Sequence, residues 1–528
     1  MSQPPPIPTP ASAGPVIKTS GAAKMLGALL VAPLFLLAVA TLWIPACNVG
    51  LSSFQSHNDG SGDGNWTRAL VFTLAVAVVR VLAGIVPILF GVSLAFAGSV
   101  ARNLARSVFL FFALFLGPLS YGLSSVVLVY QLVPGGLQQP LNAQAFLLFG
   151  EALLTAVMVT GVALWLFPGI RAATEPEKRG ANLGRLILAA ILLLGVFASG
   201  LQAFTLPLSE FGGPASSTAT LALLDYEGLM MAAPVNPGSW LPLGIVTFLG
   251  LASGISVVSC NLRFSLSNIA ARPEPTGCAV GAICGLILFS VALIAMIPIF
   301  ASIFGLVGFA KGSTLTGLTP SLLAQLMPGI QHQLLLVLPW LVLVVPATYL
   351  AALGIGGLRP FGRHSEWILL PFFPFFFVSI GTLWPVFYQL ILKYSLFRNP
   401  LAVVYPLLAN VPFLVFLTLF FKGQREHWMN ITPRPSFFRG VILPSLPVTV
   451  TLALAGSVFV IRDLLWQLVS GSSNDNLVQI LLTNVEELST NGMSSLVLIF
   501  AAGSILAFFP VLAVLQLLVI DRIRIRAG

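Results

Sequence analysis

The chain has 528 residues, of which 57% are hydrophobic and only 8% are charged, and its mean hydropathy is +0.99. Soluble domains carry roughly 25% charged residues, so a water-soluble protein is excluded because no part of the chain has enough charge to solvate a domain. The net charge of +9 is spread over many short loops and is not gathered on one soluble module, which excludes a nucleic-acid-binding surface.

The first 24 residues are rich in Pro, Ser and Ala, which predicts a disordered N-terminal segment, residues 1–24. This segment is too polar for a secretory signal peptide. The first apolar run is therefore expected to stay in the protein as a membrane span.

Apolar runs then fill most of the chain, and each is long enough to cross a bilayer core, which needs ~20 apolar residues per helix. Backbone groups in hydrocarbon must bond to one another, so uninterrupted runs of this kind predict helices and not a barrel. The expected fold is an all-α polytopic membrane protein with about twelve transmembrane helices: 25–45, 69–97, 108–132, 145–168, 185–208, 243–262, 278–308, 333–357, 367–392, 398–421, 439–463 and 494–520.

Lys and Arg fix the expected orientation. Most of the 25 basic residues fall in the loops that share a side with the N-terminus, and the positive-inside rule assigns that side to the cytoplasm. The long polar segments 46–68, 209–242 and 464–493 carry almost no basic residues and are expected outside. We therefore expect a multi-pass protein of the cell (plasma or inner) membrane with both termini in the cytoplasm.

Two predicted cytoplasmic loops carry a related pattern, and each follows the fourth span of its half of the chain. The first reads RAATEPEKRGANLGRLIL from Arg171, and the second reads REHWMNITPRPSFFRGVILP from Arg425. Arg171 aligns with Arg425, and Arg185 aligns with Arg439. A loop repeated at one topological position predicts two equivalent docking points for a cytoplasmic partner.

A further pattern follows the fifth span, where Gly212-Gly213-Pro214 precedes a Ser/Thr run, and the second loop leaves through Phe438 and Ile442-Leu443-Pro444. Together with the paired loops, these segments resemble the permease subunits of binding-protein-dependent type I ABC importers, in particular the maltose-type sugar family. The resemblance extends more diffusely over nearly all of the chain past residue 25.

This resemblance implies two fused six-helix permease units, 25–270 and 271–528, arranged as pseudo-symmetric halves. It implies cytoplasmic ABC ATPase subunits docked on the two loops, and an extracytoplasmic substrate-binding protein received by the outer loop at Gly212, Gly213 and Pro214. Sugar or a similar small solute would cross between the halves, within membrane lipid. The implied docking residues are Arg171, Ala172, Ala173, Glu177, Arg185, Arg425, Glu426, His427, Ile431, Phe438 and Pro444.

The loops also depart from the family pattern. Arg171 and Arg425 stand where the family has Glu, and the family's Gly falls on Glu177 and Ile431. The second loop contains two prolines, which disfavour a continuous helix. A degenerate permease that serves as a membrane scaffold or regulator therefore stays open as an alternative, and so does a secondary transporter with six plus six spans.

Few residues in the spans could carry chemistry. Arg80 and Glu151 lie in or near apolar spans, where ionisable groups line a cavity or pair with one another. The four cysteines show no metal-ligand spacing, so no metal or other cofactor is expected. No phosphate-binding loop of the GxxxxGK[ST] type occurs, so we expect no enzyme, and any ATP-driven work must come from a partner.

The orientation can be tested by labelling single cysteines placed at Ser216 and Ser436 in a background without the native cysteines. Impermeant reagents are expected to react with the first from outside and with the second from the cytoplasm. Reaction of both from one side would contradict the topology.

Overall fold

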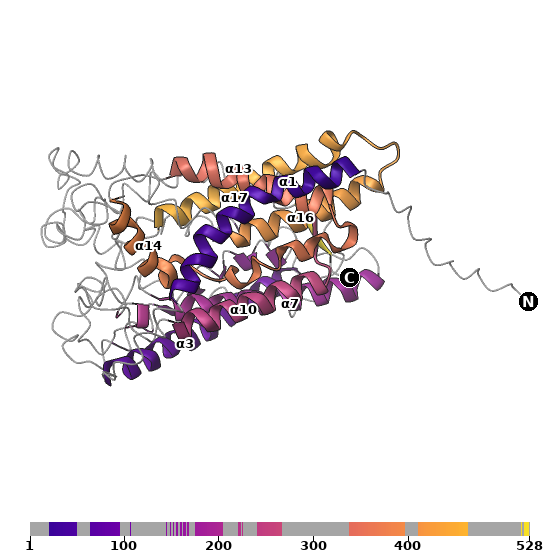
Figure 1. Ribbon diagram of the computed structural model, residues 1–528. Coiled ribbons are helices and arrows are strands. Elements are labelled where there is room, and N and C mark those ends of the chain that lie inside the picture. The colour runs from indigo at the N-terminus through magenta and orange to yellow at the C-terminus, as the bar shows by residue number, and fades with distance from the viewer. Residues whose placement is uncertain are drawn as a thin grey trace, which may run out of the picture.

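The structure is a computed structural model that describes residues 21–49, 64–95, 175–203, 240–266, 337–395, 410–462 and 522–526, with scattered positions among 106–167, 220–224 and 519. This part of the chain is mostly helical, and its long helices lie side by side (Figure 1). The predicted class, a helical membrane protein, is confirmed at this level.

Five described helices are long and apolar enough to cross a membrane: Gly21–Val49, Trp66–Leu94, Asn182–Leu201, Leu241–Ser259 and Val337–Leu358. They comprise α1 (Gly21–Ala38) with the π turn η1 (Val39–Trp43), α3 (Gly64–Ala95), α7 (Glu175–Leu201), α10 (Trp240–Ser259), and the run of η6 (Trp340–Val344), α13 (Val345–Ala352) and η7 (Leu353–Leu358). Each coincides with a predicted span. The predicted spans 108–132 and 278–308 lie outside the described residues, and so does 494–520 except for Val519. The count of twelve and the symmetry of the halves therefore stay predictions.

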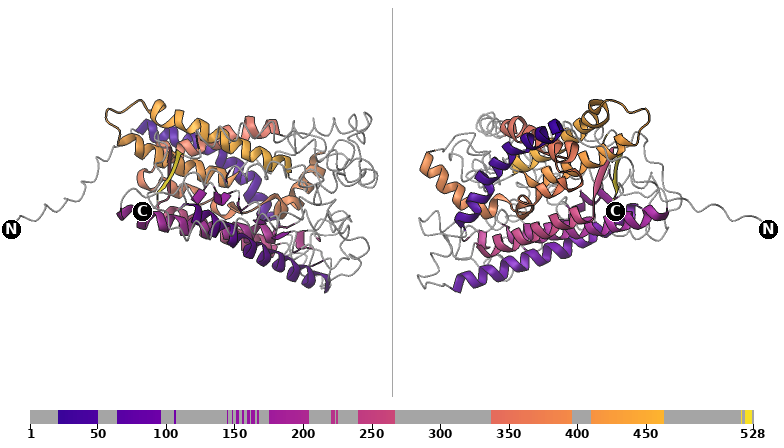
Figure 2. Two further views of the ribbon diagram at one scale, coloured as in Figure 1. Left: turned by 180° about the vertical axis from the view of Figure 1, so that it is seen from behind. Right: turned by 45° about the vertical axis from the view of Figure 1, so that its right-hand side comes forward.

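The helices form two layers (Figures 1 and 2). One layer contains α3, α7 and α10, and the other contains α1, α13, α16 (Val411–Met429) and α17 (Leu443–Arg462), which the π turn η11 (Phe438–Ile442) precedes. Although α1 is first in sequence, it packs closely on α13 and η7. One continuous set of buried apolar residues joins the two layers.

The chain between the layers departs from the prediction, because residues 367–392 do not form one continuous helix. The segment consists of two 3-10 helices, η8 (Gly362–Leu369) and η9 (Phe373–Phe375), an irregular stretch at 376–379, and the α-helix α14 (Ile380–Tyr394). Pro371 and Pro374 account for the break, since each lacks an N–H and disfavours helical geometry in the residue before it. We call residues 370–379 the discontinuity.

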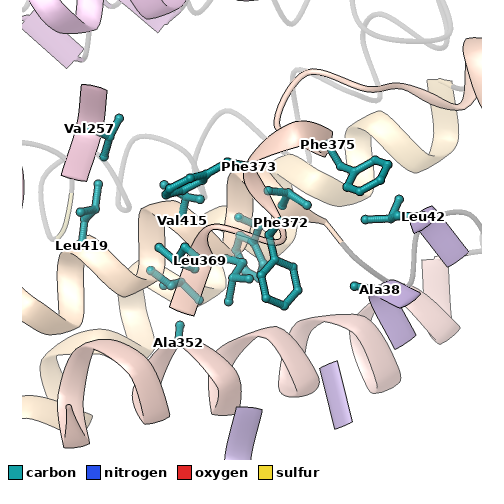
Figure 3. Packing of buried hydrophobic residues seen from close by; sticks show 14 of the residues in the cluster. Ala38, Leu42, Val257, Ala352, Leu369, Phe372, Phe373, Phe375, Val415 and Leu419 are labelled. Carbon is teal, nitrogen blue, oxygen red and sulfur yellow. The ribbon is translucent and has the colours of Figure 1, made fainter. Parts of the chain in front are cut away.

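Protein covers the middle of the discontinuity, as an irregular backbone at membrane depth requires, whereas Leu370 and Ser379 at its ends are exposed. Phe372, Phe373 and Phe375 are between 0% and 3% exposed. Figure 3 shows them among side chains of α1, α10, α13 and α16. On α10, a Cβ at Gly250 would lie 2.6 Å from the carbonyl oxygen of Phe373, so glycine is what allows the two backbones to meet.

The predicted span 398–421 ends too early. Helix α16 continues to Met429, and its N-terminus is capped by the side chain of Asn410, which accepts from the Phe413 N–H at 3.0 Å. Nearly every residue of α16 from Val411 to Gln424 is buried. It is the central helix of its layer. Packing by its neighbours therefore keeps the chain helical past the end of the apolar run, so that Lys422 lies within the helix.

A small two-stranded sheet was not expected in an all-α fold. Strand β1 (Arg263–Leu266) pairs antiparallel with β2 (Ile523–Arg526), with Phe264 opposite Ile525. The alternation Ile-Arg-Ile-Arg in β2 is the period-two pattern of a strand. β1 contacts α16, and β2 contacts α7.

The sheet marks the end of the molecule where the segments predicted to be cytoplasmic converge. The residues after α10, the residues after η7, the end of α16 and the C-terminal strand all lie there (Figure 1). Gly27 of α1 lies against Leu358 and Pro360 at the same end. We call it the inner end; the membrane face to which it belongs stays a prediction.

Because α10 contacts the discontinuity at one glycine and not at another, the loss of stability on glycine substitution is expected to depend strongly on the position in α10. Gly250→Ala is expected to destabilise the protein by roughly 1–3 kcal/mol, because the new methyl group meets backbone that cannot rotate away. Gly244→Ala on the same helix is the matched control, since nothing lies within 4 Å of its Cβ position. Unfolding of the purified variants in detergent measures both, and equal midpoints would contradict the packing.

Candidate functional site

The two ionisable residues singled out in the spans contact each other. Arg80 on α3 donates from Nε to Oε2 of Glu151 at 2.6 Å, and its Nη2 contacts the same oxygen. Arg80 Nη1 donates to Ser199 Oγ on α7 at 3.0 Å. The Glu151 side chain is 1% exposed and that of Arg80 is 17% exposed. Of the two alternatives, a cavity lining and a pair, the structure shows the pair.

Pairing makes this buried polar site electrically neutral. Removing one partner of a buried ion pair destabilises a protein by roughly 3–5 kcal/mol, since the other charge is left uncompensated. The hydrogen bonding of the pair is nevertheless incomplete, because Glu151 Oε1 has no hydrogen-bond partner in the part of the chain that the structure describes. A buried carboxylate oxygen without a donor is rare and marks this pair as a candidate substrate contact.

A second polar group, Gln202 at the end of α7, holds the discontinuity. Its Oε1 accepts from the N–H of Ser379 at 2.7 Å, from Ser379 Oγ at 2.8 Å and from Thr382 Oγ1 at 3.3 Å. Its Nε2 donates to the carbonyl oxygens of Phe377 and Ala198, both at 2.9 Å. On the other side, Trp43 Nε1 donates to the Pro371 carbonyl at 3.0 Å. Side chains of two helices thus replace the helical bonds that the break removes.

Gln202 was not predicted from the sequence. The available signal was an amide side chain at the end of the apolar run 185–208, three residues after Ser199. Positions three apart are neighbours on a helix face. Because Gln202 contacts the discontinuity and Ser199 contacts Arg80, the discontinuity and the Arg80–Glu151 pair lie against neighbouring positions at the end of α7.

At the inner end, five charged residues form a network that joins three separated segments. Glu366 Oε1 accepts from Arg359 at 3.0 Å and from Lys422 at 3.2 Å, with Lys422 and Glu366 only 3% and 5% exposed. Glu426 pairs with Arg263 of β1 and lies 3.7 Å from Arg359. The network ties η8 and β1 to α16. Glu366 was not predicted, although it is an acidic residue within an otherwise basic inner segment.

The first predicted docking loop is described only in part. Arg171, Ala172 and Ala173 lie outside the described residues, as do Gly212, Gly213 and Pro214 of the outer loop. Glu177 lies in the first turns of α7, which begins at Glu175, before Pro176. Arg185 is buried and donates from Nη1 to Asn182 Oδ1 at 3.0 Å.

The second docking loop is described throughout. Arg425, Glu426 and His427 belong to the last turns of α16, not to a separate short helix, and Glu426 is engaged in the inner-end network. Arg425 is half-buried, and burial lowers the pKa of its guanidinium, with the charge of Arg359 acting in the same direction; an arginine nevertheless stays protonated in proteins.

The residues after α16 differ in exposure. Ile431 and Pro444 are half-buried, whereas Phe438 is 57% exposed and Arg439 is exposed. Trp428 Nε1 donates to the Pro435 carbonyl at 2.7 Å, so the connecting residues fold back on the helix end. Thr432, Pro433, Arg434 and Ser436 are exposed as well, so the accessible part of this loop runs from Thr432 to its exit at Phe438 and Arg439.

Among the described residues, no group of three or more His, Cys, Asp or Glu side chains could hold a metal ion. Comparison with protein-family models, with curated proteins and with solved structures finds no match to this chain.

The role of Gln202 can be tested by changing one function of its side chain at a time. Gln202→Met is expected to remove the hydrogen bonds of Gln202 to the Ser379 N–H and to the Phe377 carbonyl, each worth about 0.5–1.5 kcal/mol. Gln202→Glu keeps the acceptor for Ser379 and loses the donor. Hydrogen exchange of peptides covering 376–383 should accelerate strongly in the first variant and less in the second. Unchanged exchange in Gln202→Met would show that the discontinuity does not depend on this side chain.

Proposed function

We propose that this chain is the transmembrane permease component of an ABC-type importer, which forms the path for a sugar or similar small solute and couples to separate ATPase subunits. Its two predicted docking loops would receive the ATPases, and its outer loops would receive an extracytoplasmic binding protein. Both termini would lie in the cytoplasm, as the distribution of Lys and Arg indicates.

The observation that carries the proposal is the arrangement of the inner end. Helix α7 contains the docking residues Glu177 and Arg185 of the first loop, and α16 contains Arg425, Glu426 and His427 of the second. The β1–β2 sheet contacts both helices, because β2 packs on α7 and β1 packs on α16. Two segments far apart in sequence are therefore mechanically connected at one end of the molecule, as two docking points that act together require.

The alternative of a degenerate permease that serves as a membrane scaffold is favoured by one observation. Arg425, Glu426 and His427 are part of α16, and the Glu426 carboxylate is used within the chain. A docking element built into a long helix and its internal ion pairs is less free to follow a partner's motion.

A secondary transporter is favoured by a different observation, the Arg80–Glu151 pair inside the bundle. Buried ionisable residues mark ion and proton pathways in such proteins. Solute uptake driven by an ion gradient, with no ATPase bound, would support this alternative.

The proposal predicts that the exposed exit of the second loop contacts an acidic ATPase surface. Arg425→Glu with Arg171→Glu is expected to weaken ATPase association, but Arg425 also lies beside the inner-end network, so that variant affects fold and docking together. Arg439→Glu is the cleaner test, because Arg439 is exposed. Like charges facing one another across an interface cost several kcal/mol, so co-purification of the ATPase should fall by at least about tenfold.

Lys393→Glu is the matched charge reversal, on an exposed residue in the last turn of α14, away from the inner end, and it should leave association unchanged. Tighter association of Arg439→Glu would contradict an acidic partner surface. Absence of any ATPase from the purified wild-type protein, isolated from its native membrane, would overturn the permease function. Solute uptake driven by an ion gradient would then distinguish the secondary transporter from the scaffold.

A further inference from the structure

Positive charge exceeds negative charge at the inner end, even where the side chains are largely buried. The inner-end network has three bases, Arg263, Arg359 and Lys422, and two acids, Glu366 and Glu426. Three bases that share two carboxylates leave one positive charge over. A charge in a partly buried place is costly without a counter-charge, so this excess points to an anion from outside the described part of the chain.

Arg425 adds a second positive charge to the excess. It is half-buried, and burial lowers the pKa of its guanidinium, as does the charge of Arg359. Glu426 acts in the opposite direction, but its carboxylate already contacts Arg263 and Arg359. No hydrogen bond or ion pair joins Arg425 to another described residue, so its N–H donors are available to a ligand.

The β1–β2 sheet brings one more arginine to the same place. Phe264 lies opposite Ile525, and both are buried. Successive residues of a strand point to opposite faces, so Arg263 and Ser265 share the other face with Arg524, which lies opposite Ser265. Diagonal neighbours across two strands are about 7–8 Å apart, and long side chains at that distance can reach one ligand. Within the described part of the chain, no acid pairs with Arg524.

The side chains define the chemistry of the missing anion. A guanidinium offers five N–H donors in a planar fork that fits a phosphate group in two-point contact. A phosphate monoester carries about 1.5–2 negative charges at pH 7, which is close to the two surplus charges of the network and Arg425. A single carboxylate supplies one charge and would leave half of the excess in place.

We propose that Arg263, Arg425 and Arg524 form a binding site for a phosphate monoester at the inner end. Glu426 lies between them, because Arg263 contacts its carboxylate and Arg425 precedes it in α16. The bound phosphate joins the end of α16 to both strands of the sheet. The site goes beyond the proposed function, since no ATPase, binding protein or transported solute takes part in it.

Hydrogen exchange of the full chain in phosphatidylcholine nanodiscs tests the site. Sodium phosphate is compared with sodium chloride at equal ionic strength, and peptides covering 261–266 and 422–429 are followed. Exchange through opening of the inner end should slow about tenfold when phosphate is at ten times its dissociation constant, because only the closed form binds it. In a second arm, chloride is kept and part of the phosphatidylcholine is replaced by phosphatidic acid, whose headgroup is a phosphate monoester.

Variants separate a specific site from the general stabilising effect of phosphate on folded proteins. Arg425→Gln and Arg524→Gln should lose the protection, whereas Arg363→Gln, at an exposed arginine of the same end, should keep it. In chloride, Arg425→Gln should exchange no faster than the wild type, because a charge that Arg359 repels has been removed. Faster exchange of Arg425→Gln in chloride as well as in phosphate would show a purely structural role and would overturn the site.

The two arms identify the source of the phosphate group. Protection by sodium phosphate supports a soluble ligand, and protection by phosphatidic acid alone supports a lipid headgroup. Equal protection of the wild type and of both arginine variants would mean an adventitious ion only. Protection by neither probe would show that the chain neutralises its own excess, and protection by polyglutamate alone would replace the site by a docking surface for an acidic protein; each of these results overturns the proposal and leaves the permease function untouched.

Discussion

Backbone hydrogen bonding in an apolar surrounding is the constraint on which the arrangement of this molecule depends. A helix satisfies its own peptide groups, but Pro371 and Pro374 prevent a continuous helix over 367–392, and the released groups must find partners in the protein. Gln202 supplies them from one layer and Trp43 from the other. The two layers can therefore close on each other only in the register that brings both side chains to the discontinuity.

Close packing reinforces that register. Gly250 and Gly254 of α10 lie against Phe373, where any side chain would meet the backbone or the ring. Without a hydrophobic force between helices in lipid, small residues that permit close approach supply much of the association energy. The discontinuity is thus both a break in one helix and the surface on which two layers meet.

The charged residues form two groups, one at the inner end and one in mid-span, and the two groups have different roles. At the inner end, Glu366 and Glu426 each contact two cations, and the resulting network fixes η8 and β1 to α16. In mid-span, one acid and one base cancel, and the pair retains an acceptor without a donor. A network beside the aqueous boundary can hold an excess of positive charge, whereas a pair inside hydrocarbon has to be neutral.

Part of the candidate site was predictable from residue type and depth. Arg80 and Glu151 are charged residues in apolar runs, and this alone identifies them as candidate site residues, whichever partner each has. Gln202 carries no charge and stands at the end of a run, so nothing in its local sequence sets it apart from an exposed amide. Glu366 follows a basic turn that contains its partner Arg359, but its local sequence gives no sign that Lys422, remote in sequence, is its second partner.

The sequence by itself determined the class of the protein and the positions of five spans, because a run of apolar residues is a local property that the bilayer selects by length. It also marked which loops belong together, since the placement of Lys and Arg is equally local. Only the tertiary structure decided that α1 packs on α13, that β1 pairs with β2, that α16 carries Arg425 to His427, and that residues 367–392 are broken. Each of these depends on partners remote in sequence, whose contact replaces a local hydrogen bond or fills the space that a glycine leaves open.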